Sequence, residues 1–122
     1  MKPSEIITVD SERRQTDPSK ELALVNQLIK KNNAIILQAN NSIILLAPIG
    51  VGKVEMHLYT ADSPLKLMKS AIELEKKIKA SDIKFLYYEE TNPQITEMLR
   101  RLDLTVEKSD LPNYDWMINV RR

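Results

Sequence analysis

The segment of residues 53–78 constrains the fold most, because it predicts a strand, a sharp turn and a long amphipathic helix in direct succession. Apolar and polar side chains alternate over residues 54–59, as in a strand with two different faces. Ser63 and Pro64 then predict a helix start, with a serine cap and a proline at the first helical position. This order is typical of nucleotide and coenzyme sites, where a phosphate lies at a helix N-terminus. The turn over residues 60–64 contains Asp62 and no glycine, so its chemistry disagrees with that role.

The remaining patterns predict a single α/β (α+β) domain over residues 1–122, with a mixed, mostly antiparallel sheet of six or seven strands and helices on both faces. The expected strands are residues 5–10, 34–38, 42–47, 54–59, 83–88, 104–108 and 115–120, and the expected helices begin near residues 18, 64 and 93. The runs at 34–38 and 42–47 are apolar on both faces, which indicates a covered sheet. The helix after residue 63 favours a parallel crossover to residues 83–88. We expect residues 1–20 to form a first strand followed by a flexible polar arm.

The composition excludes several kinds of site. The 122-residue chain has no cysteine, which excludes disulfides, thiolate nucleophiles and cysteine-ligated metals. Its single histidine, His57, does not favour a zinc site. The net charge of +1 gives no global attraction to nucleic acids or anionic membranes. The chain shows neither a membrane-spanning run nor the apolar core of a signal peptide, so we expect an intracellular protein.

The predicted order β-α-β-β-β-α-β-α-β-β resembles the GNAT-type N-acyltransferase fold over nearly the whole chain, most strongly from Lys53 onward. More narrowly, two stretches are similar to small GNAT-like proteins of tailed bacteriophages. These stretches are TADSPLKLMKSAIEL (residues 60–74) and NPQITEMLRRLDLTVEKSDLPNYDWMINV (residues 92–120). Some of those phage proteins are virion or DNA-ejection components. The resemblance therefore implies a GNAT-like fold that belongs either to an enzyme or to a virion protein.

This sequence departs from the family pattern at two places. GNAT enzymes carry a Gln/Arg-x-x-Gly-x-Gly/Ala loop whose amides bind the coenzyme A pyrophosphate. The equivalent residues 59–65 contain no glycine and no basic residue, and the charge of Asp62 would repel a pyrophosphate. Where many members place a general-acid tyrosine, this chain has Leu99, and Asp103 and Leu104 replace a usual Gly-Phe pair. Residue-for-residue comparison thus finds neither the coenzyme cradle nor the usual proton donor.

If the chain is an enzyme, its candidate catalytic residues lie on two neighbouring strands. Glu55 and His57 share one face of the central strand, where either could act as the general base. Tyr88, at the end of the next strand, is an alternative general acid. The expected coenzyme contacts are Leu58, Tyr59, Ser63 and Asn92. The structural alternative is a polar strand face for the first pair, with packing for at least one of the adjacent Tyr87 and Tyr88.

The leading hypothesis is a catalytically degenerate GNAT-like phage protein that uses no cofactor and resides in the virion or the host cytoplasm. It would act through contacts with virion or host proteins, with residues 1–20 as a docking arm and Tyr114 as an exposed interface anchor. The alternative is a divergent N-acetyltransferase that uses acetyl-coenzyme A. A third, weaker hypothesis is a nucleic-acid-associated factor, because basic pairs occur at residues 13–14, 100–101 and 121–122.

Overall fold

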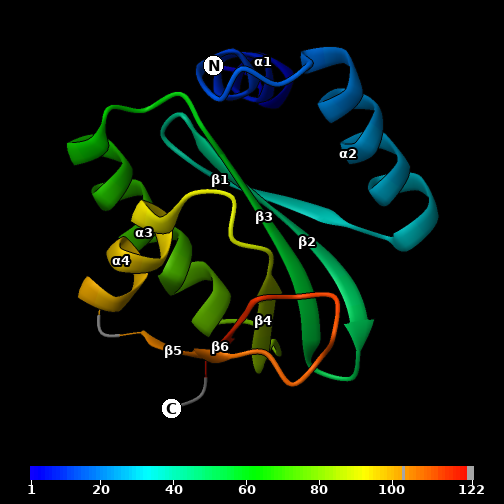
Figure 1. Cartoon of the computed structure of the whole chain (residues 1–122), viewed down its shortest axis with the longest axis vertical. Helices are drawn as coiled ribbons and strands as arrows, with labels where there is room; N and C mark the ends of the chain where they lie inside the picture. Colours follow the sequence, from blue (N-terminus) through cyan, green and yellow to red (C-terminus); the bar gives the residue numbers. More distant parts are fainter. Residues whose placement is uncertain (103, 121–122) are drawn as a thin grey trace.

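The computed structural model describes residues 1–102 and 104–120, which contain one six-stranded sheet (Figure 1). The strands lie side by side in the order β1-β2-β3-β4-β6-β5. Their bounds are β1 (Ile35–Ala39), β2 (Ser42–Gly50), β3 (Lys53–Thr60), β4 (Phe85–Tyr88), β5 (Thr105–Lys108) and β6 (Trp116–Asn119). The helices are α1 (Pro3–Arg13), α2 (Pro18–Asn32), α3 (Pro64–Lys79) and α4 (Pro93–Arg101). Since β3 and β4 pair in parallel and the other neighbours pair antiparallel, the prediction of a mixed, mostly antiparallel sheet is confirmed.

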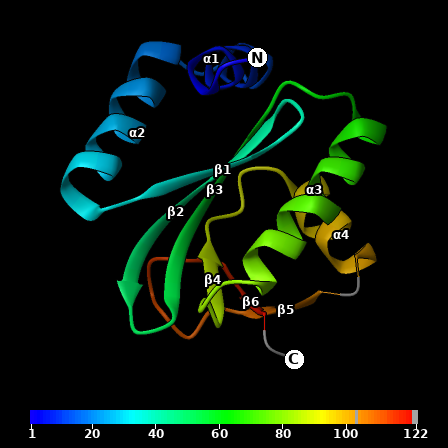
Figure 2. The same cartoon turned by 180° about the vertical axis from the view of Figure 1, so that it is seen from behind.

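Helices cover both faces of the sheet, as the sequence predicted (Figure 1 and Figure 2). Helices α1 and α2 pack on one face, whereas α3 and α4 pack on the other. Alternate residues of β2 enter the two cores, with Ile43 and Leu45 on the α1–α2 side and Ile44 and Leu46 on the α3–α4 side. All four are at most 7% exposed, which explains the continuous apolar run. No helix in the described ranges is long and apolar enough to cross a membrane.

Residues 5–10 lie in helix α1, so the prediction of a first strand there is wrong. The helix begins with Pro3 at its first position, and the Glu5 carboxylate accepts a backbone N–H at the cap at 2.9 Å. Ile6 and Ile7 are 0% and 2% exposed and pack in the core beneath α1 and α2. Their β-branched side chains favour a strand locally, but burial of this apolar face against the sheet overrides that preference.

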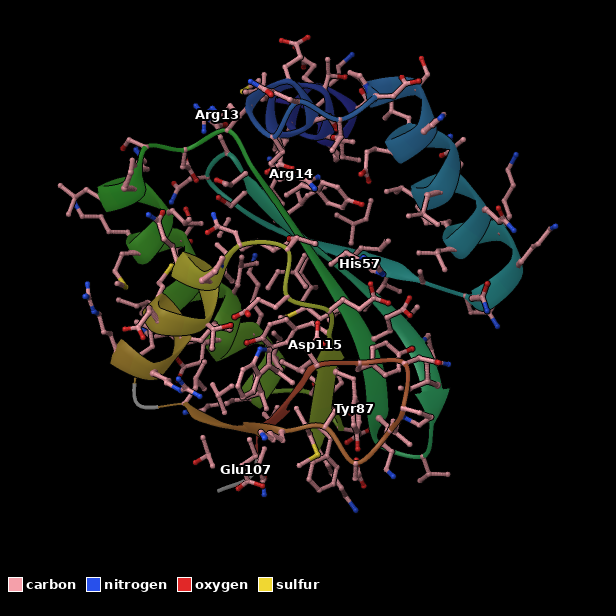
Figure 3. The ribbon with its side chains drawn as sticks, viewed as in Figure 1. Arg13, Arg14, His57, Tyr87, Glu107 and Asp115 are labelled. Atoms are coloured by element: carbon pink, nitrogen blue, oxygen red, sulfur yellow. The ribbon has the colours of Figure 1, made fainter. Side chains whose placement is uncertain are left out.

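The polar arm expected at residues 11–20 is replaced by helical structure that packs on the sheet. Helix α1 extends to Arg13, and the chain then turns at Gln15, which has a left-handed backbone with φ 59°. Helix α2 begins where the sequence predicted it, because the Asp17 carboxylate accepts a backbone N–H of the first turn at 2.9 Å. This arrangement places Arg13 at the turn after β3 and Arg14 beside β3 (Figure 3).

Strands β3 and β4 separate at the centre of the sheet. Their parallel pairing ends with Glu55 opposite Tyr87. Beyond that point β3 continues beside β2 to Thr60, whereas β4 ends at Tyr88 and the chain leaves the sheet for α4. The sheet is therefore open on one side of β3 over the second half of that strand.

Candidate functional site

A cleft of about 660 Å³ lies where β3 and β4 separate. Its walls come from β3, the end of α1, the turn into α3, the loop after β4, and α4. Met56, Leu58 and Met98 contribute apolar surface, while His57 and Tyr88 contribute polar groups. A volume of this size is typical of sites for small molecules and cofactors.

Glu55 and His57 extend from one face of β3 and contact each other. The Nε2 atom of His57 lies 2.9 Å from Oε2 of Glu55, and the Tyr114 hydroxyl donates to Oε1 of the same carboxylate at 2.7 Å. Tyr114 is half-buried, and its ring centroid lies 5.7 Å from that of Tyr87. Tyr114 is therefore only partly exposed, and through it the loop between β5 and β6 contacts Glu55. Its role as an interface anchor stays a prediction.

These hydrogen bonds determine where the protons of the pair lie. Burial raises the pKa of Glu55, but the hydrogen bonds from His57 and Tyr114 outweigh burial and hold this pKa below its usual value of 4.5. An ionised carboxylate can only accept hydrogen bonds, so Nε2 of a neutral His57 carries the proton and Nδ1 keeps its lone pair. Because His57 borders the cleft, its imidazole is equipped to act there as a base.

Tyr88 reaches the cleft from the opposite face of the sheet, in the core with α3 and α4. Its side chain is 5% exposed, and its hydroxyl lies 3.0 Å from Oγ1 of Thr96, which donates to the Glu90 carboxylate at 2.8 Å. Since the single hydroxyl proton of Thr96 is directed to Glu90, Tyr88 is the donor in its own contact. Burial raises the pKa of Tyr88, so the phenol keeps its proton at neutral pH. Local sequence patterns do not predict the contacts of Tyr88 with Thr96 and of Thr96 with Glu90, because these contacts depend on how the loop after β4 folds.

Asp62 borders the cleft, but its carboxylate is engaged within the protein. The residue is 6% exposed, and its Oδ2 atom accepts hydrogen bonds from Ser42 at 2.6 Å and from Ser70 at 2.9 Å. These serines belong to β2 and α3, so Asp62 joins the sheet to the helix. Ser63 caps α3 as predicted, since it accepts the N–H of Lys66 at 3.4 Å. The Asp62 carboxylate, which was expected to repel a pyrophosphate, thus accepts two internal hydrogen bonds that stabilise the turn.

Arg13 brings a guanidinium group to the same turn from α1 (Figure 3). Its Nη1 and Nη2 atoms donate to the carbonyl oxygens of Asp62 at 2.9 Å and of Ala61 at 3.0 Å. The side chain is exposed and borders the cleft, and a guanidinium with five donors keeps N–H groups for a ligand. A positive charge therefore stands beside a turn that has no basic residue of its own. Local sequence patterns miss Arg13 because it lies 49 and 48 residues before its partners.

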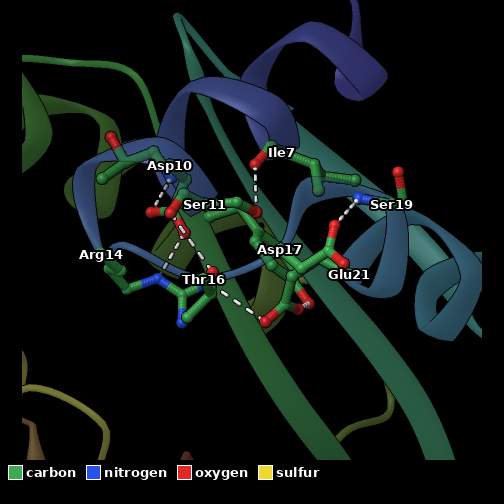
Figure 4. Close-up of polar contacts among 10 residues, drawn as sticks. Ile7, Asp10, Ser11, Arg14, Thr16, Asp17, Ser19 and Glu21 are labelled. Carbon is green, nitrogen blue, oxygen red and sulfur yellow. Dashed lines mark hydrogen bonds and ion pairs between the residues drawn. The ribbon is translucent and has the colours of Figure 1, made fainter.

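Arg14 joins α1 to α2 beside β3 (Figure 4). Its Nε atom lies 2.7 Å from Oδ2 of Asp10, and its Nη2 atom lies 3.7 Å from Oε1 of Glu21. Glu21 in turn accepts the hydroxyl hydrogen of Tyr59 at 3.0 Å. Burial raises the pKa of Tyr59, with Glu21 adding to the effect, so the hydroxyl stays protonated. Tyr59 is only 2% exposed, and its role as a coenzyme contact stays a prediction.

Comparison with solved structures decides the fold. The chain superposes on GCN5 of Tetrahymena with a TM-score of 0.60 and 10% identity, covering 93% of this chain and 82% of that one. It superposes on the N-acetyltransferase PseH of Campylobacter jejuni, in complex with acetyl coenzyme A, with a TM-score of 0.55 and 15% identity, covering 97% and 90%. A GNAT superfamily phosphinothricin acetyltransferase of Sinorhizobium meliloti, in complex with AcCoA, gives a TM-score of 0.51 and 12% identity, covering 84% of this chain and 66% of that one. The chain has the GNAT fold.

The resemblance is confined to three-dimensional structure. No protein-family model and no curated protein matches the sequence. The GNAT fold predicted from the sequence is confirmed, whereas the narrower resemblance to phage proteins stays a hypothesis. At these identities the structural matches establish the fold, and the activity has to be argued from the residues of this chain.

Within this GNAT fold, most of the predicted site residues meet at the cleft. Those that border it are His57, Leu58, Tyr59, Tyr88 and Asn92. Glu55 contacts His57, and Asn92 also caps α4 by accepting a backbone N–H at 3.0 Å. Leu99, which the resemblance aligned with the general-acid tyrosine of GNAT enzymes, is 8% exposed in the core. Asp103 lies outside the described residues.

The basic pairs are partly engaged in contacts within the protein. Arg14 is bound to Asp10, and the guanidinium carbon of Arg100 lies 5.2 Å from the centre of the Trp116 ring. Arg101 borders the cleft, and residues 121–122 lie outside the described part of the chain. These contacts do not favour a shared surface for nucleic acid.

Proposed function

We propose that this protein is an N-acyltransferase that uses an acyl-coenzyme A as its donor. The observation that carries the proposal is that His57 and Tyr88 border one cleft from opposite faces of the sheet. Acyl transfer to an amine needs a group that takes a proton from nitrogen and a group that gives one to the leaving sulfur. His57 with its free Nδ1 lone pair suits the first task, and Tyr88 with its raised pKa suits the second.

The proposed reaction is an amine attack on a thioester. The acceptor nitrogen attacks the thioester carbonyl carbon, a C–N bond forms, and the C–S bond breaks. The proton lost by nitrogen passes to Nδ1 of His57, whose imidazolium is stabilised by the Glu55 carboxylate 2.9 Å from Nε2. Tyr88 gives its proton to the departing thiolate, and the proton on His57 is released to solvent, from which Tyr88 is reprotonated.

The side chains at the edge of the cleft suit a phosphorylated donor. Arg13 presents its guanidinium at the turn before α3, and Arg101 borders the cleft from α4. Guanidinium groups bind phosphates through paired, charge-assisted hydrogen bonds. The Asp62 carboxylate is engaged by two serine hydroxyl groups. The guanidinium group of Arg13, in contrast, has N–H donors left for a ligand. In this proposal, the two arginine side chains bind the phosphates in place of the backbone amides that a glycine-rich turn would offer.

Calorimetric titration of acetyl-coenzyme A tests donor binding, and thiol release with spermidine or a lysine-containing peptide as acceptor probe tests the chemistry. We expect a Kd of about 1 μM–1 mM, the ordinary range for enzyme substrates. His57→Gln should lower kcat by about 10²–10⁴-fold and leave the Kd unchanged. Glu97→Gln, an exposed residue of α4, is the matched control and should change neither quantity. An unchanged kcat in His57→Gln would show that His57 is not the general base.

A second candidate function is the degenerate one, in which a phage-type GNAT-like protein acts through protein contacts. The observation that favours it is the turn at residues 60–64, which lacks glycine and whose carbonyl groups at positions 61 and 62 are bound by Arg13. The same titration separates the two functions. Absence of acetyl-coenzyme A binding at millimolar concentration, together with detection of the protein in purified phage particles, would support this second function and exclude the first.

A further inference from the structure

A second, smaller cavity lies beside the cleft, in the core between the sheet and helices α3 and α4. Its volume is about 40 Å³. Nearly all its lining is apolar, and the two charged residues at its edge, Glu75 and Lys79, are paired with each other at 2.7 Å. We propose that this cavity is an acyl-chain pocket and that the donor carries an acyl group longer than acetyl. This inference rests on the proposed acyltransferase function.

The cavity and the cleft share part of their lining. Met56, Leu58 and Met98 border both spaces. Methionine is unbranched and has three rotatable bonds, so it adapts to irregular apolar surroundings without large strain. In this proposal, rotation of Met56 and Met98 joins the cavity to the cleft. An acyl chain that starts at the reacting carbonyl in the cleft would extend between these two side chains.

The sequence creates this space by placing short side chains among long ones. Ala71 on α3 borders the cavity, whereas Leu74, the next residue of this helix along the cavity wall, is 1% exposed and fills the core. On the opposite wall, Leu99 of α4 stands where many GNAT enzymes place a tyrosine. Leucine is shorter than tyrosine and has no hydroxyl group. A leucine at this position therefore cannot donate a proton, and it gives the cavity an apolar wall.

The volume of the cavity limits the length of the chain. A cavity needs about 10–15 Å³ to hold one water molecule, so this cavity has room for about three groups of that size. Apolar cavities of this kind stay dry and accept apolar ligands. A butyryl group carries three carbon atoms beyond its carbonyl, which matches this room. Each buried methylene group contributes about fourfold in affinity, so butyryl-coenzyme A should bind roughly 15-fold more tightly than acetyl-coenzyme A.

The test is a calorimetric series with acetyl-, butyryl-, hexanoyl- and decanoyl-coenzyme A. We expect affinity to rise from acetyl to butyryl and to gain nothing further at decanoyl. Ala71→Leu should fill the cavity and flatten the series, and the smaller Ala71→Val should reduce the butyryl preference in part. Ala80→Leu, at the exposed end of α3, is the matched control and should leave the series unchanged. Thermal melts of each variant establish that it is folded.

A probe that needs no coenzyme distinguishes failure of this inference from failure of the proposed function. Xenon should shift the methyl carbon resonances of Met56 and Met98 in the wild type and not in Ala71→Leu. Equal affinity for all four acyl-coenzymes would overturn the acyl-chain pocket while leaving the acyltransferase function in place. Xenon shifts without binding of any acyl-coenzyme A would overturn the acyltransferase function and, with it, the assignment of the cavity to an acyl chain.

Discussion

Replacing Asp62 with alanine should destabilise the protein strongly, although Asp62 lies in a turn. Its carboxylate is the common acceptor for the hydroxyl groups of Ser42 and Ser70, both 0% exposed. These contacts tie the end of β3 to β2 on one side and to α3 on the other. Without the carboxylate, two buried donors lose their shared acceptor in a place that water does not reach.

The size of the effect follows from these two hydrogen bonds. A hydrogen bond to an ionised acceptor contributes about 1.5–3 kcal/mol. Ser42 keeps a contact with the Thr60 hydroxyl at 2.6 Å, which can take its proton, so the lower part of the summed range applies. We therefore expect Asp62→Ala to lower the free energy of unfolding by about 3–4 kcal/mol, a decrease in Tm of about 12–16 °C.

Urea unfolding at neutral pH, followed by circular dichroism, measures this change. Asp62→Asn keeps one acceptor oxygen without the charge and should lose about half as much free energy. Asp82→Ala, at an exposed position after α3, is the control and should stay within about 0.5 kcal/mol of the wild type. A loss below about 1 kcal/mol in Asp62→Ala would show that the carboxylate does not join sheet and helix.

Three further predictions concern the site. Tyr114→Phe should lower the free energy of unfolding at pH 7 by about 1 kcal/mol. Because the folded pKa of Glu55 is depressed below its usual value of 4.5, that difference should be present above this pH and shrink in denaturant melts as the pH falls through the folded pKa. A difference that is the same at every pH would count against the Tyr114 contact with Glu55. Arg13→Ala should weaken acetyl-coenzyme A binding about tenfold in calorimetry with kcat at saturation unchanged, and an unaltered Kd would remove Arg13 from the donor site. Burial, with the hydrogen bond to an aspartate, raises the pKa of Tyr87 to about 12, so stability should be complete below pH 10 and fall between pH 10 and 12. Tyr87→Phe should remove that part of the alkaline loss, and an unchanged alkaline profile would contradict it.

Features that depend on neighbouring residues were predicted correctly. The alternation along β3 placed Glu55 and His57 on one face, and the helix starts after Asp17 and Ser63 were correct. Each of these signals extends over a few residues and reflects the backbone geometry of a strand or the capping of a helix. The prediction of a strand at residues 5–10 was wrong because a short β-branched run does not show which surface of the protein will bury it.

The partners of the site residues were beyond the reach of local patterns. Glu55 is 59 residues from Tyr114, which fixes its carboxylate. Arg13 reaches the turn before α3 across 49 residues of chain, from a segment interpreted as an arm. A single sequence shows which side chains are able to donate and accept, but the pairing of distant side chains follows from the packing of the whole fold. The sequence therefore identified the candidate base and acid, while their supporting groups emerged from the structure.

The absence of glycine from the turn at residues 60–64 has a physical cause. Glycine is favoured where the backbone takes a positive φ, as it does in loops that wrap amides around a phosphate. The residues of positive φ in the described ranges are Gln15, Asn33, Asn40 and Gly52, and none lies in this turn. The turn is instead held in ordinary backbone conformations by the Asp62 carboxylate and by Arg13. Under the proposed function, an anionic donor would be recognised here by the Arg13 side chain rather than by a nest of backbone amides, so the Arg13→Ala titration tests donor binding more sharply than any change within the turn.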